Sequence, residues 1–270
     1  TLVIAGNDLV GTAWIAQLIQ PKKPLLKFTL GVGANLAVHG RTSPLDVTVV
    51  GGKPGPGPGP GGALGAASLL ASGKSWGAPS GLVGLPALHD VFVRSDGARV
   101  AVGGLVTVEL SNDGVTFSKP NVTTTVAGAL LGVWSSPTGP FLAVGTGGVL
   151  LRQGKSGWDV APGLSAPNVN WQAISGYADG VALAVGGQDI GLWHQNKWTA
   201  LSNVVGLPPK ANVLSGVACY MQGQQRMVLL GHHPVVQECT LDLSVKPQLT
   251  CAPVPVADAG KGGPPGGSGK

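Results

Sequence analysis

The sequence contains few charged residues, and this scarcity excludes an intrinsically disordered chain. Only 11% of its 270 residues are Asp, Glu, Lys or Arg, whereas 43% are hydrophobic. Disordered chains combine low hydrophobicity with high charge, so they cannot bury enough apolar surface to fold. The composition here is the opposite one, and we therefore expect a folded protein with a substantial core.

Long apolar runs and helical periodicity are also missing. No stretch approaches the roughly 18 to 20 apolar residues that a membrane-spanning helix needs, so no transmembrane segment is predicted. No helix-length amphipathic pattern is visible either. Glycine (45 residues) and proline (22 residues) are abundant instead, and the glycines lack the three-residue period of collagen. This composition favours an all-β protein with many turns.

The basic residues form no patch, which argues against nucleic-acid binding. The formal net charge is +5, but the 17 Lys and Arg residues are spread along the chain. Nucleic-acid sites need basic residues gathered on one face or along one element. We therefore predict no nucleic-acid partner.

Cysteine is scarce, and its three copies lie in the last quarter of the chain. Cys239 and Cys251 flank two short strand-like runs, so a hairpin between them would bring the two thiols together. A disulfide there would imply an oxidising compartment. The alternative is that these two residues and Cys219 are buried, reduced thiols, and the sequence leaves both open.

A repeat of about 41 residues organises the rest of the chain. Glycines that end apolar strand-like runs recur at Gly103, Gly145, Gly186 and Gly231. Aromatic residues that follow polar turns recur at Trp76, Phe117, Trp158 and Trp198. The glycine spacings are 42, 41 and 45 residues, and the aromatic spacings are 41, 41 and 40. Each unit contains four short strand-like runs, which is the size of a propeller blade.

These repeats predict one all-β domain, a β-propeller of about six four-stranded blades over residues 1–256, with seven blades as the alternative. The expected units are a partial blade at 1–25, an interrupted blade at 26–86, and complete blades at 87–128, 129–169, 170–211 and 212–256. The interruption at 41–62 contains a Pro/Gly run that we expect to be an exposed loop. Residues 257–270, rich in Gly, Pro and Lys, are predicted to form a disordered tail.

The ends of such an array need protection. An open array leaves unpaired strand edges at both ends, so we expect the blades to close into a ring. In this alignment the partial first blade lacks its first strand, while the last unit contains four strands of its own. A missing segment or a partner protein would complete the first blade. We therefore predict the incomplete first blade as one place where a partner protein assembles with this chain.

One turn carries a family resemblance. Ser111, Asp113, Gly114, Thr116 and Phe117 resemble the Asp-box, or bacterial neuraminidase repeat, of sialidase-like propellers, with one residue fewer than the usual spacing. The stretch 130–160 is also similar to repeats of bacterial surface or lipoprotein propellers, including those related to photosystem assembly factors. In such a turn the Asp binds backbone N–H groups, the Gly adopts a positive φ and the aromatic ring packs on its neighbours. The motif therefore implies a fold and structural roles for these five residues.

The residues of an enzyme form no local pattern. The resemblance would imply sialidase catalysis, which uses three arginines, a Tyr/Glu pair and an acid/base Asp. The chain has two Tyr and two Glu, none in the family's context, and its twelve acidic residues are scattered. Glycosidases need two carboxylates held a few ångströms apart. We predict no catalytic residue, no cofactor and no metal site, and a sialidase-like carbohydrate-active enzyme is the alternative.

Binding is the function that remains. The partner-binding candidates are Trp193 and His194 at a strand end, and the adjacent His232 and His233 in an expected loop. The first residues lack the features of a signal peptide, so we expect a processed or excised chain. We predict a secreted or cell-envelope scaffold of bacterial type that binds a protein or a glycan. A structural subunit of a larger extracellular assembly is the further alternative.

Overall fold

The computed structural model is almost entirely β-structure, as the composition predicts. The described residues are 2–7, 12–18, 26–32, 36–42, 45–51, 66–69, 76–77, 86–113, 115–123, 128–207, 214–232, 235–244 and 246–253. They form β-strands and two short 3₁₀ helices, η1 (Gly104–Val106) and η2 (Thr146–Gly148). No helix in this part of the chain is long and apolar enough to cross a membrane.

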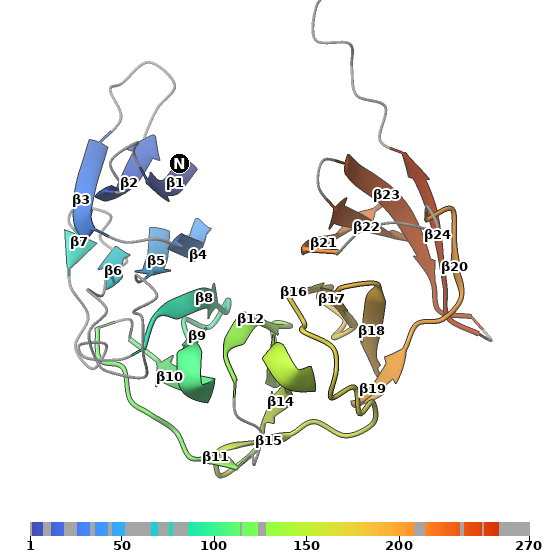
Figure 1. Ribbon diagram of the computed structural model, residues 1–270. Coiled ribbons are helices and arrows are strands. Elements are labelled where there is room, and N and C mark those ends of the chain that lie inside the picture. The colour runs from blue at the N-terminus through green and yellow to red at the C-terminus, as the bar shows by residue number, and fades with distance from the viewer. Residues whose placement is uncertain are drawn as a thin grey trace, which may run out of the picture.

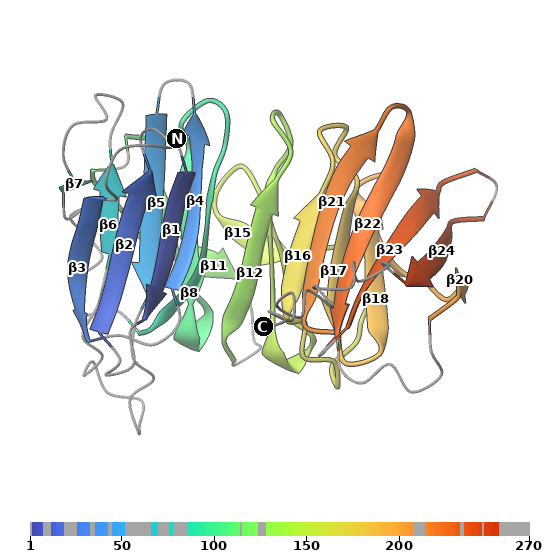
Figure 2. The ribbon, with the colours of Figure 1, turned by 90° about the horizontal axis from the view of Figure 1, so that it is seen from above.

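Six sheets follow one another along an arc around a common axis (Figure 1). One strand of each sheet lies nearest the axis, and we call these the inner strands. They are β1 (Leu2–Asn7), β4 (Leu36–Thr42), β8 (Leu88–Val93), β12 (Leu130–Ser135), β16 (Ala173–Gly176) and β21 (Gly216–Gln222). Each inner strand contacts the next one along the arc, and Figure 2 shows the sheets standing side by side.

The first two sheets correct two predicted boundaries. The first sheet has the order β1, β2 (Thr12–Leu18), β3 (Leu26–Val32), and the second β4, β5 (Leu45–Gly51), β6 (Ala66–Leu69), β7 (Trp76–Gly77). Strand β3 therefore belongs to the first sheet, and not to a unit at 26–86. The stretch 41–62 is not wholly an inserted loop, because β5 pairs with β4 and β6 and is buried over 47–51.

The next two sheets differ in strand number from the four predicted for each unit: within the described residues the third sheet has three strands and the fourth has five. The third sheet adds β9 (Arg99–Gly103) and β10 (Thr107–Ser111) to β8. The fourth adds β13 (Phe141–Gly145), β14 (Leu150–Gln153), β15 (Trp158–Val160) and β11 (Val122–Thr123) to β12. The middle strands β9 and β13 are buried over all five of their residues, so each contributes side chains to the packing on both faces of its sheet.

The last two sheets continue the same order. The fifth adds β17 (Ala182–Gly186), β18 (Asp189–His194) and β19 (Lys197–Ala200) to β16. The sixth adds β22 (Gln225–His232), β23 (Val235–Asp242), β24 (Gln248–Pro253) and β20 (Val204–Val205) to β21. The aromatic landmarks Phe117, Trp158 and Trp198 are buried between sheets. Sheet-on-sheet packing of apolar side chains therefore holds successive units together.

The fifth strands of the fourth and sixth sheets come from the connection that leaves the preceding unit. Strand β11 pairs in parallel with β15, and β20 pairs in parallel with β24. The Trp158 N–H donates to the Asn121 carbonyl at 2.7 Å, and the Leu249 N–H donates to the Asn203 carbonyl at 2.9 Å. Each connection thus covers the outer edge of the next sheet, which would otherwise offer unpaired backbone groups.

Three of the four landmark glycines stand where two backbones approach closely. A Cβ atom on Gly103, Gly145 or Gly186 would lie 2.0 to 2.2 Å from a backbone carbonyl oxygen within the three residues that precede the inner strand, a distance no side chain tolerates. A Cβ atom on Gly231 would lie 3.7 Å from its nearest neighbour. Gly231 is therefore not equivalent to the other three, and its spacing of 45 residues marks a change of register.

This change of register exchanges the two faces of the sixth sheet. In the fourth sheet Leu142, three residues before its glycine, packs forward against the fifth sheet. Val228 holds the same place before Gly231, yet it packs backward with residues of the fifth sheet. A slip of one residue along a strand moves every side chain to the opposite face. The outward face of the sixth sheet consequently exposes Tyr220 (37%) and Val236 (47%).

The arc is open between its ends. The first and last sheets lie apart in Figure 1, and no strand pairing joins them within the described ranges. The closed ring that we expected is therefore not formed by these strands. Within the described residues no further sheet packs on the outward face of the sixth sheet, which leaves Tyr220 and Val236 exposed there. Residues 257–270 lie outside the described part of the chain.

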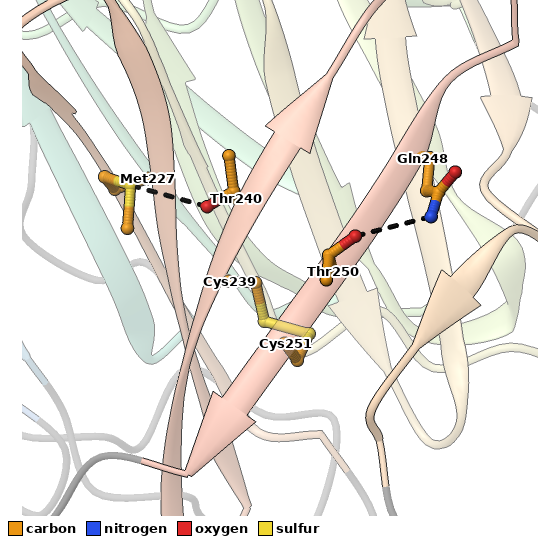
Figure 3. Close-up of a disulfide and its surroundings, with 6 residues drawn as sticks. All are labelled: Met227, Cys239, Thr240, Gln248, Thr250 and Cys251. Carbon is orange, nitrogen blue, oxygen red and sulfur yellow. Dashed lines mark hydrogen bonds between the residues drawn. A yellow bond between two sulfur atoms is a disulfide. The ribbon is translucent and has the colours of Figure 1, made fainter.

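A disulfide joins the two outer antiparallel strands of the sixth sheet (Figure 3). Cys239 of β23 and Cys251 of β24 lie directly opposite in register, and Cys219 of β21 is free. Next to the disulfide, the Thr240 hydroxyl of β23 donates to the Met227 sulfur of β22 at 3.8 Å. The bridge therefore fixes the pairing of the last two strands of the described chain.

Candidate binding site

One end of the arc carries the turns that join each inner strand to the second strand of its sheet. In three neighbouring sheets these turns span residues 94–98, 136–140 and 177–181. In the turns 94–98 and 177–181, the N–H of the first residue of the turn donates to the carbonyl of its fifth residue, at 2.8 Å in both turns. The side chains of Asp96 and Asp179 accept the N–H of the fifth residue. The repeat thus places similar turns side by side, and the hollows of the molecule lie among them.

The first hollow, which we call the Trp134 hollow, lies between the ends of β8, β12 and β16 and measures about 230 Å³. Its lining is Phe92, Val93, Arg94, Ser95, Trp134, Ser135, Ser136, Pro137, Gly176, Tyr177 and Ala178. The Phe92 ring meets the Trp134 ring edge-on, with centroids 6.5 Å apart. A Cβ atom on Gly176 would lie 2.6 Å from the Trp134 ring, so only glycine leaves room for the indole there.

The second hollow, the Trp193 hollow, measures about 280 Å³ and shares Trp134 and Ser136 with the first. Its lining is Trp134, Ser136, Thr138, Gly139, Pro140, Asp179, Gly180, Val181, Trp193, His194, Gln195 and Asn196. The Trp193 ring packs against Trp198 with centroids 5.6 Å apart. The two hollows form one recess that crosses from the third sheet to the fifth.

The third hollow, the seam hollow, lies between the fifth and sixth sheets and measures about 360 Å³. Its lining is Leu192, His194, Gln195, Lys197, Thr199, Ala200, Leu201, Ser202, Leu243, Ser244, Lys246 and Pro247. His194 and Gln195 line this hollow and the Trp193 hollow as well. The three hollows are therefore neighbours in a row from the third sheet to the sixth.

The structure brings two of the four predicted binding residues together. Trp193 and His194 are consecutive at the end of β18, and both line the Trp193 hollow. His232 ends β22 within a strand pair, where we expected a loop, because its backbone pairs with Val235. His233 lies outside the described residues. The structure therefore places only the backbone of His232, at the end of β22.

Ion pairs neutralise the charged side chains beside the first two hollows. The Nε and Nη2 groups of Arg94 donate to the Asp96 carboxylate, with the shortest contact 2.7 Å, and its Nη1 group donates to the Gly139 carbonyl in the next sheet. Arg226 of the sixth sheet donates to Asp179 of the fifth. The hydrogen bond from Arg94 lowers the pKa of Asp96. Burial raises the pKa of Asp179, but the hydrogen bonds from Arg226 and Val181 lower it more, so the net pKa shift is downward.

The described arginines do not converge on one site. Arg99 is buried and donates to the hydroxyl of Thr48 in the second sheet. Arg94 and Arg226 bind two different carboxylates in different sheets. These three side chains thus join neighbouring sheets or turns, which is a structural use of arginine. The part of the chain that the structure describes also contains no cluster of three metal-ligating residues.

The Asp-box-like turn follows β10 at the outer edge of the third sheet, at the same end as the turn 94–98, because Ser111 pairs with Arg99. One carboxylate oxygen of Asp113 accepts hydrogen bonds from the Val115 and Thr116 N–H groups at 2.8 Å and from the Ser111 hydroxyl at 2.9 Å. The bond from Thr116, followed by those from Val115 and Ser111, lowers the pKa of Asp113 to about 2. Phe117 is buried against the second sheet. Gly114 lies outside the described residues, and the arrangement seen is that of a structural turn.

Sequence reasoning missed several residues of the row. Trp134, Ser136 and Asp179 belong to three different turns or strands, and a single repeat does not reveal that they meet. One signal was available: Asp96-Gly97 and Asp179-Gly180 occupy the same place in two repeats, next to an inner strand. Because inner strands of a propeller are neighbours, turns at equal positions in the repeat lie at one end of the fold.

The sequence matches no family model and no curated protein. Its fold is similar to that of solved β-propellers. For virginiamycin B lyase from Staphylococcus aureus the TM-score is 0.57 with 11% identity, over 83% of this chain and 71% of that one. For YCF48 bound to D1 peptide the TM-score is 0.50 with 13% identity, over 89% of this chain and 77% of that one. The predicted β-propeller class is thereby confirmed, while at such identities the likeness concerns the fold alone.

Proposed function

We propose that this chain is a non-catalytic binding scaffold, secreted or held at the cell envelope, that recognises a segment of another protein. The proposed contact surface is the recess formed by the Trp134 and Trp193 hollows. The observation that supports it most is the sharing of Trp134 and Ser136, which places the two hollows side by side across three sheets. Two hollows side by side across three sheets suit an extended peptide better than a compact small molecule.

The exposure of the tryptophans favours a protein segment over a glycan. Sugar rings stack on the open face of an aromatic side chain, which must then be accessible to solvent. Trp134 is 7% exposed and Trp193 is 3% exposed. Both rings are held edge-on or tilted against other aromatics. The Trp134 hollow therefore offers a mainly apolar space, and the Trp193 hollow offers one of mixed lining, in which the two indole rings lie beside hydroxyl, amide and carboxylate groups; peptide side chains can insert into both.

The solved neighbours agree with a binding role without deciding it. YCF48 is described bound to a peptide, whereas virginiamycin B lyase is named as an enzyme. The pairing of Arg94 with Asp96 and of Arg226 with Asp179 favours binding for this chain, because paired groups are not free to act on a substrate. Membership of the Asp-box family stays a prediction, supported by the turn at Asp113.

The location is proposed from the disulfide. Cys239 and Cys251 are joined on neighbouring strands. Disulfides persist in secreted proteins, the periplasm and cell surfaces, and are rare in the reducing cytosol. The bridge therefore supports a secreted or cell-envelope protein.

A random peptide display library tests the proposed function. Ala178→Trp fills the mouth of the Trp134 hollow and Thr138→Trp fills the Trp193 hollow, and both positions are exposed, so the fold should tolerate them. Val160→Trp, at an exposed position of β15 outside all three hollows, is the matched control. We expect enriched peptides to lose at least about tenfold in affinity for the two filled variants and to keep their affinity for the control.

Two outcomes would contradict the proposal. One is a folded protein that enriches no peptide, and the other is an enriched peptide that binds the filled variants as well as the wild type. Turnover of a sialoside by the purified protein would replace the binding scaffold with the sialidase-like enzyme.

A further inference from the structure

The seam hollow differs from the other two hollows in its charge. Lys197 enters it from the fifth sheet and Lys246 from the sixth, and both side chains are exposed. No carboxylate is part of its lining. Among the described residues, neither lysine has a carboxylate within ion-pair distance, whereas Arg94 and Arg226 both have one.

The other groups around this hollow are mainly hydrogen-bond donors. The hydroxyls of Thr199, Ser202 and Ser244 and the amide of Gln195 complete its polar lining. The nearest acidic residue along the chain is Asp242, and one oxygen of its carboxylate accepts a hydrogen bond from the Ser244 N–H at 2.8 Å. Two ammonium groups with hydroxyl and amide donors form a set that binds a carboxylate.

The turn that separates the seam hollow from the Trp193 hollow is held in an unusual conformation. Gln195 and Asn196 both have positive φ, at 52° and 61°. The pair closes a two-residue hairpin between His194 and Lys197. Such hairpins favour Asn or Gly at these places, and Gln is strained there. The strain holds the Gln195 side chain on the wall between the two hollows, where both include it in their lining.

From this placement we infer that the recognised segment is acidic, with its hydrophobic side chains in the Trp134 and Trp193 hollows and a carboxylate of the same segment in the seam hollow between Lys197 and Lys246. The inference rests on the proposed function, because it names the chemistry of the peptide that the recess would hold. Gln195 is the residue that the bound segment must cross, and its amide contacts the peptide backbone.

The experiment compares one enriched peptide that contains Asp or Glu with its Asn or Gln counterpart, by fluorescence anisotropy. The wild type should bind the acidic peptide about five- to tenfold more tightly than the neutral one. Lys197→Gln with Lys246→Gln should bind both peptides equally. Lys155→Gln, on the corresponding exposed turn of the fourth sheet, is the control and should keep the preference.

The outcomes separate this inference from the proposed function. Peptides that bind the recess without any acidic preference would overturn the inference and leave the binding scaffold standing. The preference for the acidic peptide could also survive in the double lysine variant, or be lost equally in the Lys155 control. Either result would assign the preference to the overall positive charge of the protein and overturn the inference. Failure of every peptide to bind would overturn both. Capture of sulfated polysaccharide with no peptide binding would replace the acidic peptide by an anionic glycan.

Discussion

A buried carboxyl group between two inner strands makes the stability of this fold depend on pH. One oxygen of Asp90 in β8 accepts the Val91 N–H, and the other accepts the Val133 N–H of β12, both at 2.8 Å. Burial raises the pKa of Asp90 to about 7, although the two hydrogen bonds oppose the shift. The carboxyl group therefore links the third and fourth sheets at a position where its ionised form is poorly solvated.

The direction of the pH effect follows from the raised pKa. The folded protein holds this proton more tightly than the unfolded chain, whose Asp has a pKa of 3.8. The stabilising contribution is thus complete below about pH 4 and is lost as the pH rises through 7. A shift of about three pK units corresponds to about 4 kcal/mol at most, and on the order of 2 kcal/mol if water reaches the partly buried group.

Asp90→Asn tests this magnitude. Urea unfolding at pH 4.5, 5.5, 6.5 and 7.5 should show the wild type losing on the order of 2 kcal/mol, and about 3 kcal/mol at most, relative to the variant across this range. The comparison must be with the variant, because burial lowers the pKa of His39 and His89, and these two contribute the opposite slope. Asp189→Asn, at an exposed position, is the control. Equal pH slopes for the wild type and Asp90→Asn would refute the reasoning.

Four further substitutions probe the fold by chemical denaturation. Cys251→Ser should lower the unfolding free energy by about 2 to 3 kcal/mol and abolish its response to reductant, since the bridge closes a 12-residue separation; an unchanged stability would argue against the bridge. Gln195→Gly should raise the unfolding free energy by about 1 kcal/mol because glycine relieves the positive φ, and a destabilised variant would contradict this strain. Gly145→Ala should lower the unfolding free energy by more than about 3 kcal/mol, because its Cβ would lie 2.0 Å from the Ala129 carbonyl oxygen. Gly231→Ala should change the unfolding free energy by less than about 0.5 kcal/mol. Equal effects would show that the two glycines are structurally equivalent.

The repeat predicted the sheets best where spacing and burial agree. Gly103, Gly145 and Gly186 mark true structural equivalents because each is held by the same close backbone approach. The sequence could not show that Gly231 breaks the series, since a one-residue slip leaves the hydrophobic run intact and only changes which face it covers. Strand β5 was assigned to an insertion because a Pro/Gly run follows it directly, although its own apolar residues pair with β4.

The candidate site was harder to predict than the fold, because its hollows form between repeats. Trp193 and His194 were found as residues at a strand end, which is a local property. Trp134 was assigned to blade packing, and it does pack against Phe92, yet its other edge lines two hollows. Pairs such as Arg226 and Asp179 are 47 residues apart and meet only once neighbouring sheets are in place.

The distribution of titratable groups along the row favours recognition over proton transfer. A general acid near neutral pH needs a carboxyl group whose pKa lies close to the working pH and which faces the substrate. Asp179, which lines the Trp193 hollow, has its pKa lowered and is paired with Arg226, so it stays ionised. Asp90 has a pKa near 7, but both its oxygens bind backbone N–H groups and it is not part of the three hollows described above. The carboxyl group whose pKa lies near 7 and the carboxyl group that lines the recess are therefore different residues, Asp90 and Asp179.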